Sequence, residues 1–136
     1  LSFRMEASET LKAYADSLGG HFMEYSDTRC IAIVPVPGGR TQTVTCEEFH
    51  NHLYNRKLLR FSSKVCQAEP GMDYQMVLEQ ASFFNYCRFV IRGGTLEVEA
   101  LADPASGDHQ IYTEMVMEVA NLADQYELRL SGKDAN

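Results

Sequence analysis

The longest apolar periodicity in the chain runs from Asp108 to Tyr126 and predicts an amphipathic helix. Apolar side chains recur there at helical spacing in two neighbouring stripes. The stripes are Ile111, Met115, Leu122 and Tyr126, and Tyr112, Val116, Val119 and Ala123. Together they form an unusually wide apolar arc, which must be covered on more than one side. We expect a sheet to cover part of it, and a second copy of the protein or another protein is a candidate for the remainder.

Shorter patterns predict the other elements. Residues 7–18 show helical spacing, and Gly19-Gly20 supplies a helix stop. Alternation of apolar and polar residues predicts strands, and Asp73 is a good N-cap for a helix ending near residue 84 or 85. The predicted order is helix, four strands, helix, two strands, helix, over residues 7–18, 21–25, 29–36, 41–46, 57–66, 74–84, the two arms of 86–102, and 108–126.

Two Gly-Gly pairs predict hairpins. A turn at Gly93-Gly94 pairs Ile91 with Leu96, Phe89 with Val98 and Cys87 with Ala100, and it pairs Arg88 with Glu99 on the opposite face. A two-residue loop at Gly38-Gly39 predicts the second hairpin. In its register Ile31 faces Cys46 and Ile33 faces Val44, both on the core side. The other side of this ribbon is then a semi-polar face suited to partial cover, formed by Val34, Val36, Thr41, Thr43 and Thr45.

The segment between the third and fourth strands is open to two interpretations. Thr45-Cys46-Glu47-Glu48 fits a capping box, which predicts a short helix over 47–55, and a loop is the alternative.

Composition and charge exclude several classes of protein. The formal net charge of −7 argues against general nucleic-acid binding, since that binding depends on cations that contact phosphate. No apolar run is long enough to cross a bilayer, and the first ten residues lack a signal-peptide core, so we expect a cytoplasmic protein with no membrane contact. A basic cluster stands out locally, and it either meets an acidic partner or balances the acidic second half: Arg56, Lys57, Arg60 and Lys64.

Candidate chemistry is sparse. The four cysteines are far apart, so buried free thiols are expected instead of disulfides or a zinc site. His50 and His52, with Glu47, form the one cluster of metal-like residue types, but the two histidines could share a metal only if this stretch is extended. No nucleophile has a base placed beside it by a motif. We therefore predict no enzyme activity, no cofactor and no metal, with a small-ligand or metal site near Glu47, His50 and His52 as the alternative.

Several segments resemble the YbjN family and the wider type III secretion chaperone-like fold. They are Gly38-Gly39-Arg40-Thr41-Gln42, Leu58-Leu59-Arg60-Phe61-Ser62-Ser63, the passage from Gln80 to Ile91, and Ala123-Asp124-Gln125-Tyr126-Glu127. The resemblance runs from about Glu9 to Leu130. It implies a non-enzymatic protein, often a homodimer, which is either a regulator or a chaperone that holds an extended client segment through apolar grooves and strand edges.

The resulting expectation is one α+β domain over residues 1–136, a twisted antiparallel sheet of five to six strands with helices on one face. Residues 131–136 are expected to be a frayed tail, and residues 1–4 a cloning remnant or the start of a trimmed chain, because the first methionine is Met5. The expected function is binding of a protein partner, with a homodimer as the working unit. Candidate contact residues are Val34, Val36, Thr41, Thr43, Arg60, Met115, Val116 and Val119.

Overall fold

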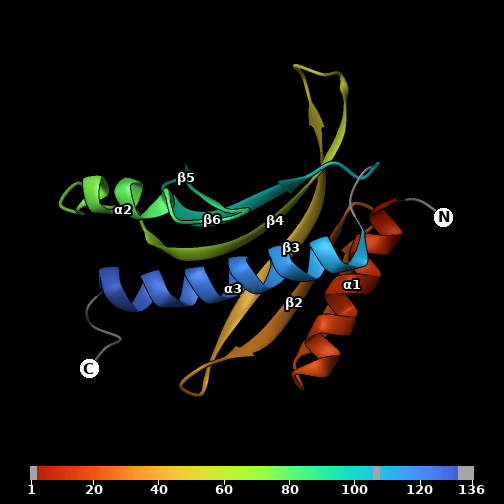
Figure 1. The fold of residues 1–136 in the computed structure, drawn as a ribbon, viewed down its shortest axis with the longest axis horizontal. Coiled ribbons are helices and arrows are strands. Elements are labelled where there is room, and N and C mark those ends of the chain that lie inside the picture. The colour runs from red at the N-terminus through yellow and green to blue at the C-terminus, as the bar shows by residue number, and fades with distance from the viewer. Residues whose placement is uncertain (1–2, 106–107, 132–136) are drawn as a thin grey trace.

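A computed structural model describes residues 3–105 and 108–131, which form an α+β fold. Six antiparallel strands make one open sheet in the order β1-β2-β3-β4-β6-β5, and the helices lie against one of its faces (Figure 1). This is the predicted architecture. The elements are α1 (Phe3–Ser17), β1 (His21–Ser26), β2 (Arg29–Val36), β3 (Arg40–Asn51), β4 (Arg56–Gln67), α2 (Tyr74–Ala81), β5 (Arg88–Arg92), β6 (Thr95–Ala102) and α3 (His109–Ser131).

Helix α3 crosses the middle of the sheet and supplies much of the core (Figure 1). Its wide apolar arc is covered from two sides within the chain, by the sheet and by α1. Tyr112, Val116 and Val119 are fully buried, and the Tyr112 ring packs on Phe61 of β4 with ring centroids 5.7 Å apart. A second copy of the protein is therefore not needed to cover this arc.

The other helices begin and end for local reasons. At the start of α2 the Asp73 carboxylate accepts a hydrogen bond from the Met76 N–H at 3.0 Å, as expected for an N-cap. Helix α1 ends before Gly19, whose φ of 74° is a conformation that glycine adopts without strain. Phe3 and Arg4 lie in α1, whereas residues 1–2 and most of the expected tail lie outside the described residues.

The hairpin of β5 and β6 has the predicted register. Ile91 pairs with Leu96, Phe89 with Val98 and Arg88 with Glu99. Gly93 and Gly94 both have positive φ, as the tight turn between these strands requires.

The hairpin of β2 and β3 differs from the prediction by one residue. Pro37-Gly38-Gly39 forms a three-residue loop, so Ile33 pairs with Thr43 and Ala32 pairs with Val44. Because side chains alternate between the two faces of a strand, the shift turns β2 over. Its buried side is Cys30, Ala32, Val34 and Val36, whereas Ile31 and Ile33 lie on the open side.

The predicted alternatives for residues 47–55 are both wrong for the first half of that segment. β3 continues to Asn51, and Glu48 and Phe49 pair with Leu59 and Leu58 of β4. The partner strand therefore overrides the local capping signal. The resulting β3–β4 hairpin projects beyond the rest of the sheet (Figure 1), and it turns at residues 52–55, where Asn55 has a φ of 53°.

Candidate protein-binding surfaces

Strand β1 is one edge of the sheet, because only β2 neighbours it in the strand order. Five of its six side chains are exposed, and the sixth is half-buried. Met23 and Tyr25 are large apolar side chains that are 56% and 64% exposed. An edge with unpaired backbone groups and exposed apolar side chains can accept a further strand.

The open face of the sheet carries a network of ion pairs centred on Glu99. This carboxylate is fully buried, and it lies 2.7 Å from Arg88, 2.6 Å from Arg92 and 3.3 Å from Arg60. Burial by itself raises the pKa of Glu99, but the hydrogen bonds from Arg92 and Arg88 outweigh it, and the pKa lies below its ordinary value. Glu99 is therefore ionised at neutral pH and gathers three guanidinium groups on this face.

A hollow of about 640 Å³ lies on the open face where β3 and β4 separate. The pairing of β3 with β4 ends at Thr45 and Ser62, so the backbones of residues 40–44 and 63–67 diverge. Side chains bridge the gap: Gln42 donates to Ser63 Oγ at 2.9 Å, and Ser63 donates to the Thr43 carbonyl at 2.6 Å. The lining is Arg29, Ile31, Thr41, Gln42, Thr43, Thr45, Glu47, Ser62, Ser63, Lys64, Arg92, Glu97 and Glu127.

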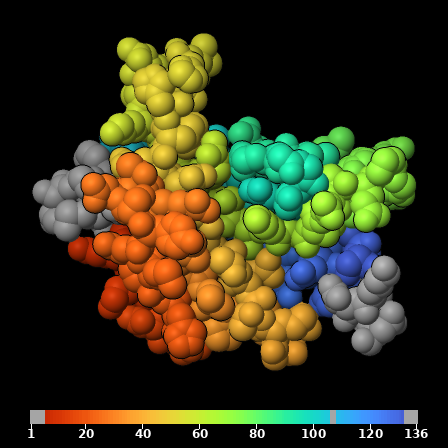
Figure 2. Space-filling view, turned by 180° about the vertical axis from the view of Figure 1, so that it is seen from behind, coloured from red at the N-terminus to blue at the C-terminus, as the bar shows by residue number. Residues whose placement is uncertain are grey.

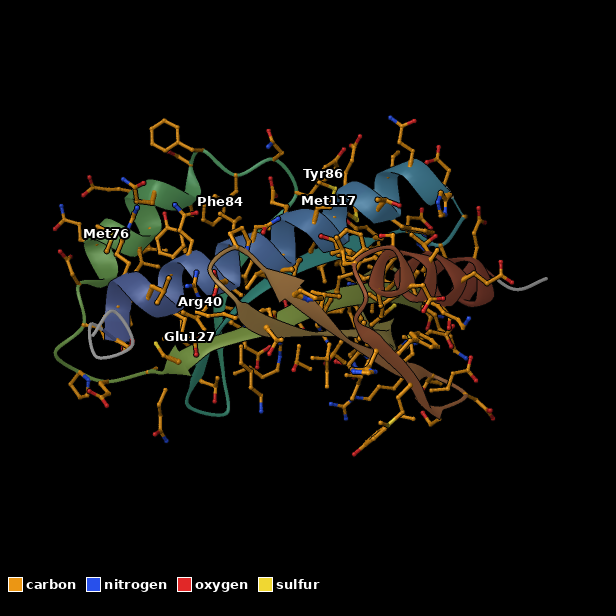
Figure 3. The ribbon with its side chains drawn as sticks, turned by 90° about the horizontal axis from the view of Figure 1, so that it is seen from below. Arg40, Met76, Phe84, Tyr86, Met117 and Glu127 are labelled. Atoms are coloured by element: carbon orange, nitrogen blue, oxygen red, sulfur yellow. The ribbon has the colours of Figure 1, made fainter. Side chains whose placement is uncertain are left out.

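A second groove, of about 570 Å³, lies between α3 and the segment that links α2 to β5. Glu118 on α3 anchors this segment by accepting hydrogen bonds from the backbone N–H groups of Asn85, Tyr86 and Cys87, at 2.7–3.0 Å. Figure 3 shows Tyr86 beside Met117 at this groove. One carboxylate therefore holds three successive amides of this segment against α3.

The structure separates the predicted contact residues into two groups. Thr41 and Thr43 are exposed on the open face, and Arg60 lies there within the Glu99 network. The other five are buried in the core of the chain, which corrects their assignment to a contact surface: Val34, Val36, Met115, Val116 and Val119. The two valines of β2 are buried because of the one-residue shift in register, and the three α3 residues because α1 and the sheet enclose that helix.

The histidines considered for a metal lie next to one another, but their carboxylate does not join them. The rings of His50 and His52 are 4.9 Å apart between centroids. Glu47 points to the open face, where it binds Arg60 at 3.1 Å. Within the described residues there is no group of three or more His, Cys, Asp or Glu side chains that could hold a metal, so the geometry does not favour this site.

Three of the four cysteines are buried, as predicted, whereas Cys66 is half-buried, and all four are free thiols. Burial raises the pKa of the Cys87 thiol, and the neighbouring Glu118 carboxylate raises it further. Burial likewise raises the pKa of Cys66. These two thiols therefore stay protonated at neutral pH, which makes them poor nucleophiles.

The strand over residues 21–25 was predicted from the sequence, but its suitability as a binding surface was not. Met23 and Tyr25 have the same parity, so the alternation already placed two large apolar side chains on one face. The edge position was the missing information, because it depends on the strand order. The hollow was also missed, since it arises where β3 and β4 diverge.

Comparison with solved structures supports the fold. The chain is similar to the Yersinia pestis type III secretion chaperone SycH, solved in complex with a stable fragment of YscM2, with a TM-score of 0.54 and 13% sequence identity. The match covers 91% of this chain and 98% of the SycH chain. No family model matches the sequence, and the comparison with curated proteins gives no match either. None of the described helices is both long and apolar enough to span a membrane. The chain thus has the secretion chaperone-like fold, without a family assignment.

Proposed function

We propose that this protein is a non-enzymatic binding module that holds an extended segment of a partner protein along β1. The observation that carries the proposal is the exposed β1 edge with Met23 and Tyr25. A partner strand added there would gain backbone hydrogen bonds, and the two apolar side chains would gain cover. The similarity in fold to SycH, a chaperone solved with a protein fragment, is consistent with this role.

The opposite edge, β5, is less suited to strand addition. It has five residues, and it begins with Arg88 and ends with Arg92. Charged side chains on an edge strand oppose pairing with another strand, because pairing would remove water from them. β1 carries one formal charge, on Glu24, apart from the titratable His21. The partner is therefore assigned to β1.

The working unit is proposed to be a cytoplasmic homodimer, acting as a regulator or as a chaperone. Exposed apolar side chains on α2 and just after it support self-association, because Leu78 is 67% exposed and Phe83 is 77% exposed. Sedimentation velocity tests this part: a particle that stays monomeric at high concentration contradicts the dimer but leaves binding at β1 in place.

The test of the binding role compares the wild type with the double variant Met23→Ser/Tyr25→Ser. Both side chains are more than half exposed, so the variant is expected to fold, but the apolar groups that a partner strand would cover are gone and the charge is unchanged. Tagged protein is used to recover partners from the source cell, and the partner segment protected from protease is then identified by mass spectrometry. The proposal predicts an extended segment that the wild type retains and the variant loses.

A matched control is Leu53→Ser/Tyr54→Ser in the turn between β3 and β4, which also removes two exposed apolar side chains, away from β1. It should retain the partner. Retention of the same partner by the β1 variant, or loss by both variants alike, would remove β1 as the binding edge.

A further inference from the structure

The hollow in the open face combines cations with hydroxyl groups. Two of its cations, Arg29 and Lys64, take no part in the ion pairs that Glu47, Glu97 and Glu99 form on this face. The Arg29 guanidinium lies over the Tyr25 ring at 5.5 Å from its centroid. Figure 2 shows the molecule with the open face of the sheet toward the viewer, so the strands lie in front and most of α3 is hidden. An anion on this face would therefore meet two cations that the ion-pair network around Glu99 leaves available.

Carboxylates also line the hollow, but they are already engaged. Glu47 binds Arg60 at 3.1 Å, and Glu97 binds Arg92 at 3.0 Å. Glu127 reaches the hollow from α3 and interacts with Arg40. Arg29 and Lys64 thus remain as the groups that an incoming charge can pair with, on a chain whose net charge is −7.

The hollow also offers polar groups for a peptide backbone. The hydroxyl groups of Thr41 and Thr43 line the hollow at exposed positions of β3. A hydroxyl group can accept a hydrogen bond from a backbone N–H group. Backbone N–H groups of an extended segment match this pattern.

We infer that the open face binds an acidic, extended segment of the partner protein, with one carboxylate on Arg29 and another on Lys64. This inference rests on the proposed function and adds the chemistry of the partner. Arg29 on β2 pairs with Glu47 on β3, and Glu47 pairs with Arg60 on β4. Lys64 lies four residues beyond Arg60 along β4, so the two cations are two strands apart. With paired strands about 4.8 Å apart and about 3.3 Å per residue, the backbones at the two cations are separated by at least roughly 16 Å, because β3 and β4 diverge toward Lys64. An extended segment spans that distance in about five residues.

The experiment uses degenerate ten-residue peptides on an array, with two fixed positions five residues apart and all other positions randomised. The fixed pair is Asp, Asn or Lys, and the probe is the fluorescently labelled full chain. The Asp pair should retain the wild type about tenfold better than the Asn pair, and added salt should reduce the difference. The variant Arg29→Ala/Lys64→Ala should lose this preference, because both cations are gone.

The control variant is Lys12→Ala/Arg129→Ala, which removes the same net charge from α1 and α3 on the other side of the sheet. It should keep the preference for the Asp pair. Equal retention of the three peptide sets by the wild type would overturn the inference. So would an unchanged preference in the Arg29→Ala/Lys64→Ala variant, or complete displacement of the Asp peptides by millimolar glutarate, which would assign the hollow to a small anion.

The cellular partner separates this inference from the proposed function. If the partner recovered by the wild type is lost by the β1 variant but kept by Arg29→Ala/Lys64→Ala, binding at β1 stands and the acidic-segment inference fails. If both variants lose it, Lys64→Ala alone decides, because Arg29 contacts Tyr25 whereas Lys64 lies three strands from β1. Both proposals stand if Lys64→Ala also weakens retention, and the acidic-segment inference fails if it does not. If the β1 variant keeps it and Arg29→Ala/Lys64→Ala loses it, the partner is held by the open face and the β1 assignment fails.

Discussion

The two faces of the sheet bury residues by different means. On β4, Phe61 points to the covered face and packs on Tyr112, whereas Arg60 points to the open face and binds Glu47 and Glu99. On β6, Val98 and Glu99 are neighbours and both are fully buried, one among apolar side chains and the other among guanidinium groups. Burial by itself therefore does not distinguish the faces, but the chemistry of the neighbours does.

The difference assigns separate roles to the faces. Apolar burial on the covered face is favourable for any close packing, and it supplies most of the free energy of folding. Ion pairs on the open face contribute little net free energy, because the charges lose water when they pair. They hold charged groups in defined positions, which suits a surface that recognises another molecule.

The largest expected effect comes from a charge placed on the covered face. Val116→Asp should cost on the order of 5 kcal/mol, because a carboxylate would be buried at a fully enclosed apolar position without a partner. We expect this variant to be unfolded, and far-UV circular dichroism during urea denaturation measures the loss.

The matched control is Met117→Asp, on the next residue of α3. Met117 is 44% exposed, so a carboxylate there stays hydrated and the free energy of unfolding should change by about 0.5 kcal/mol or less. Equal losses in the two variants would mean that both sides of α3 are enclosed, for instance by a second copy.

A smaller effect is expected on the open face from Glu99→Gln. The change removes the charge that three arginines share, and we expect a loss of about 1–3 kcal/mol, less than for a fully enclosed pair because Arg88 and Arg92 are partly exposed. Glu47→Gln, which affects a more exposed carboxylate of the same network, should cost under about 1 kcal/mol. Urea denaturation at neutral pH compares the two variants, and a larger loss for Glu47→Gln would show that the network is not centred on Glu99.

The smallest effect is expected at acidic pH, where the stability of the wild type should fall more steeply than that of Glu99→Gln. The pKa values of Glu99 and Glu118 are lowered in the folded protein, chiefly by hydrogen bonds that outweigh burial. Their stabilisation is therefore present above the ordinary carboxyl pKa of 4.5 and is lost as the pH falls below it. Urea midpoints measured from neutral pH to pH 3 should fall for the wild type, and Glu99→Gln should fall less steeply. Parallel curves for the two proteins would contradict the role of Glu99.

Local turn chemistry explains which hairpin the sequence could predict. At Gly93-Gly94 the apolar pairs and the Arg88–Glu99 pair require the same register, so two independent signals agree. At Gly38-Gly39 the apolar residues on β2 fit either register, because Ile31, Ile33, Ala32 and Val34 are all apolar. The loop length decides between them, and the sequence does not fix it.

The surfaces were harder to predict than the fold because they depend on contacts between distant segments. The wide arc of α3 indicated extensive cover but not that α1 supplies it, so Met115, Val116 and Val119 were assigned to a surface. Thr41 and Thr43 were placed on the open face correctly, since the alternation along β3 is clear. The separation of β3 from β4 has no local signal beyond polar residues at Gln42 and Ser63.

That separation divides the sheet into two three-stranded halves, β1-β2-β3 and β4-β6-β5, which share backbone hydrogen bonds only from Thr45 and Ser62 toward the projecting hairpin. Beyond Thr45 and Ser62, the side chains of Gln42 and Ser63 link β3 to β4. Helix α3 packs against β2 and β3 of one half and against β4 and β6 of the other, so at this place the halves are held together by a helix and by side chains instead of by a continuous ladder.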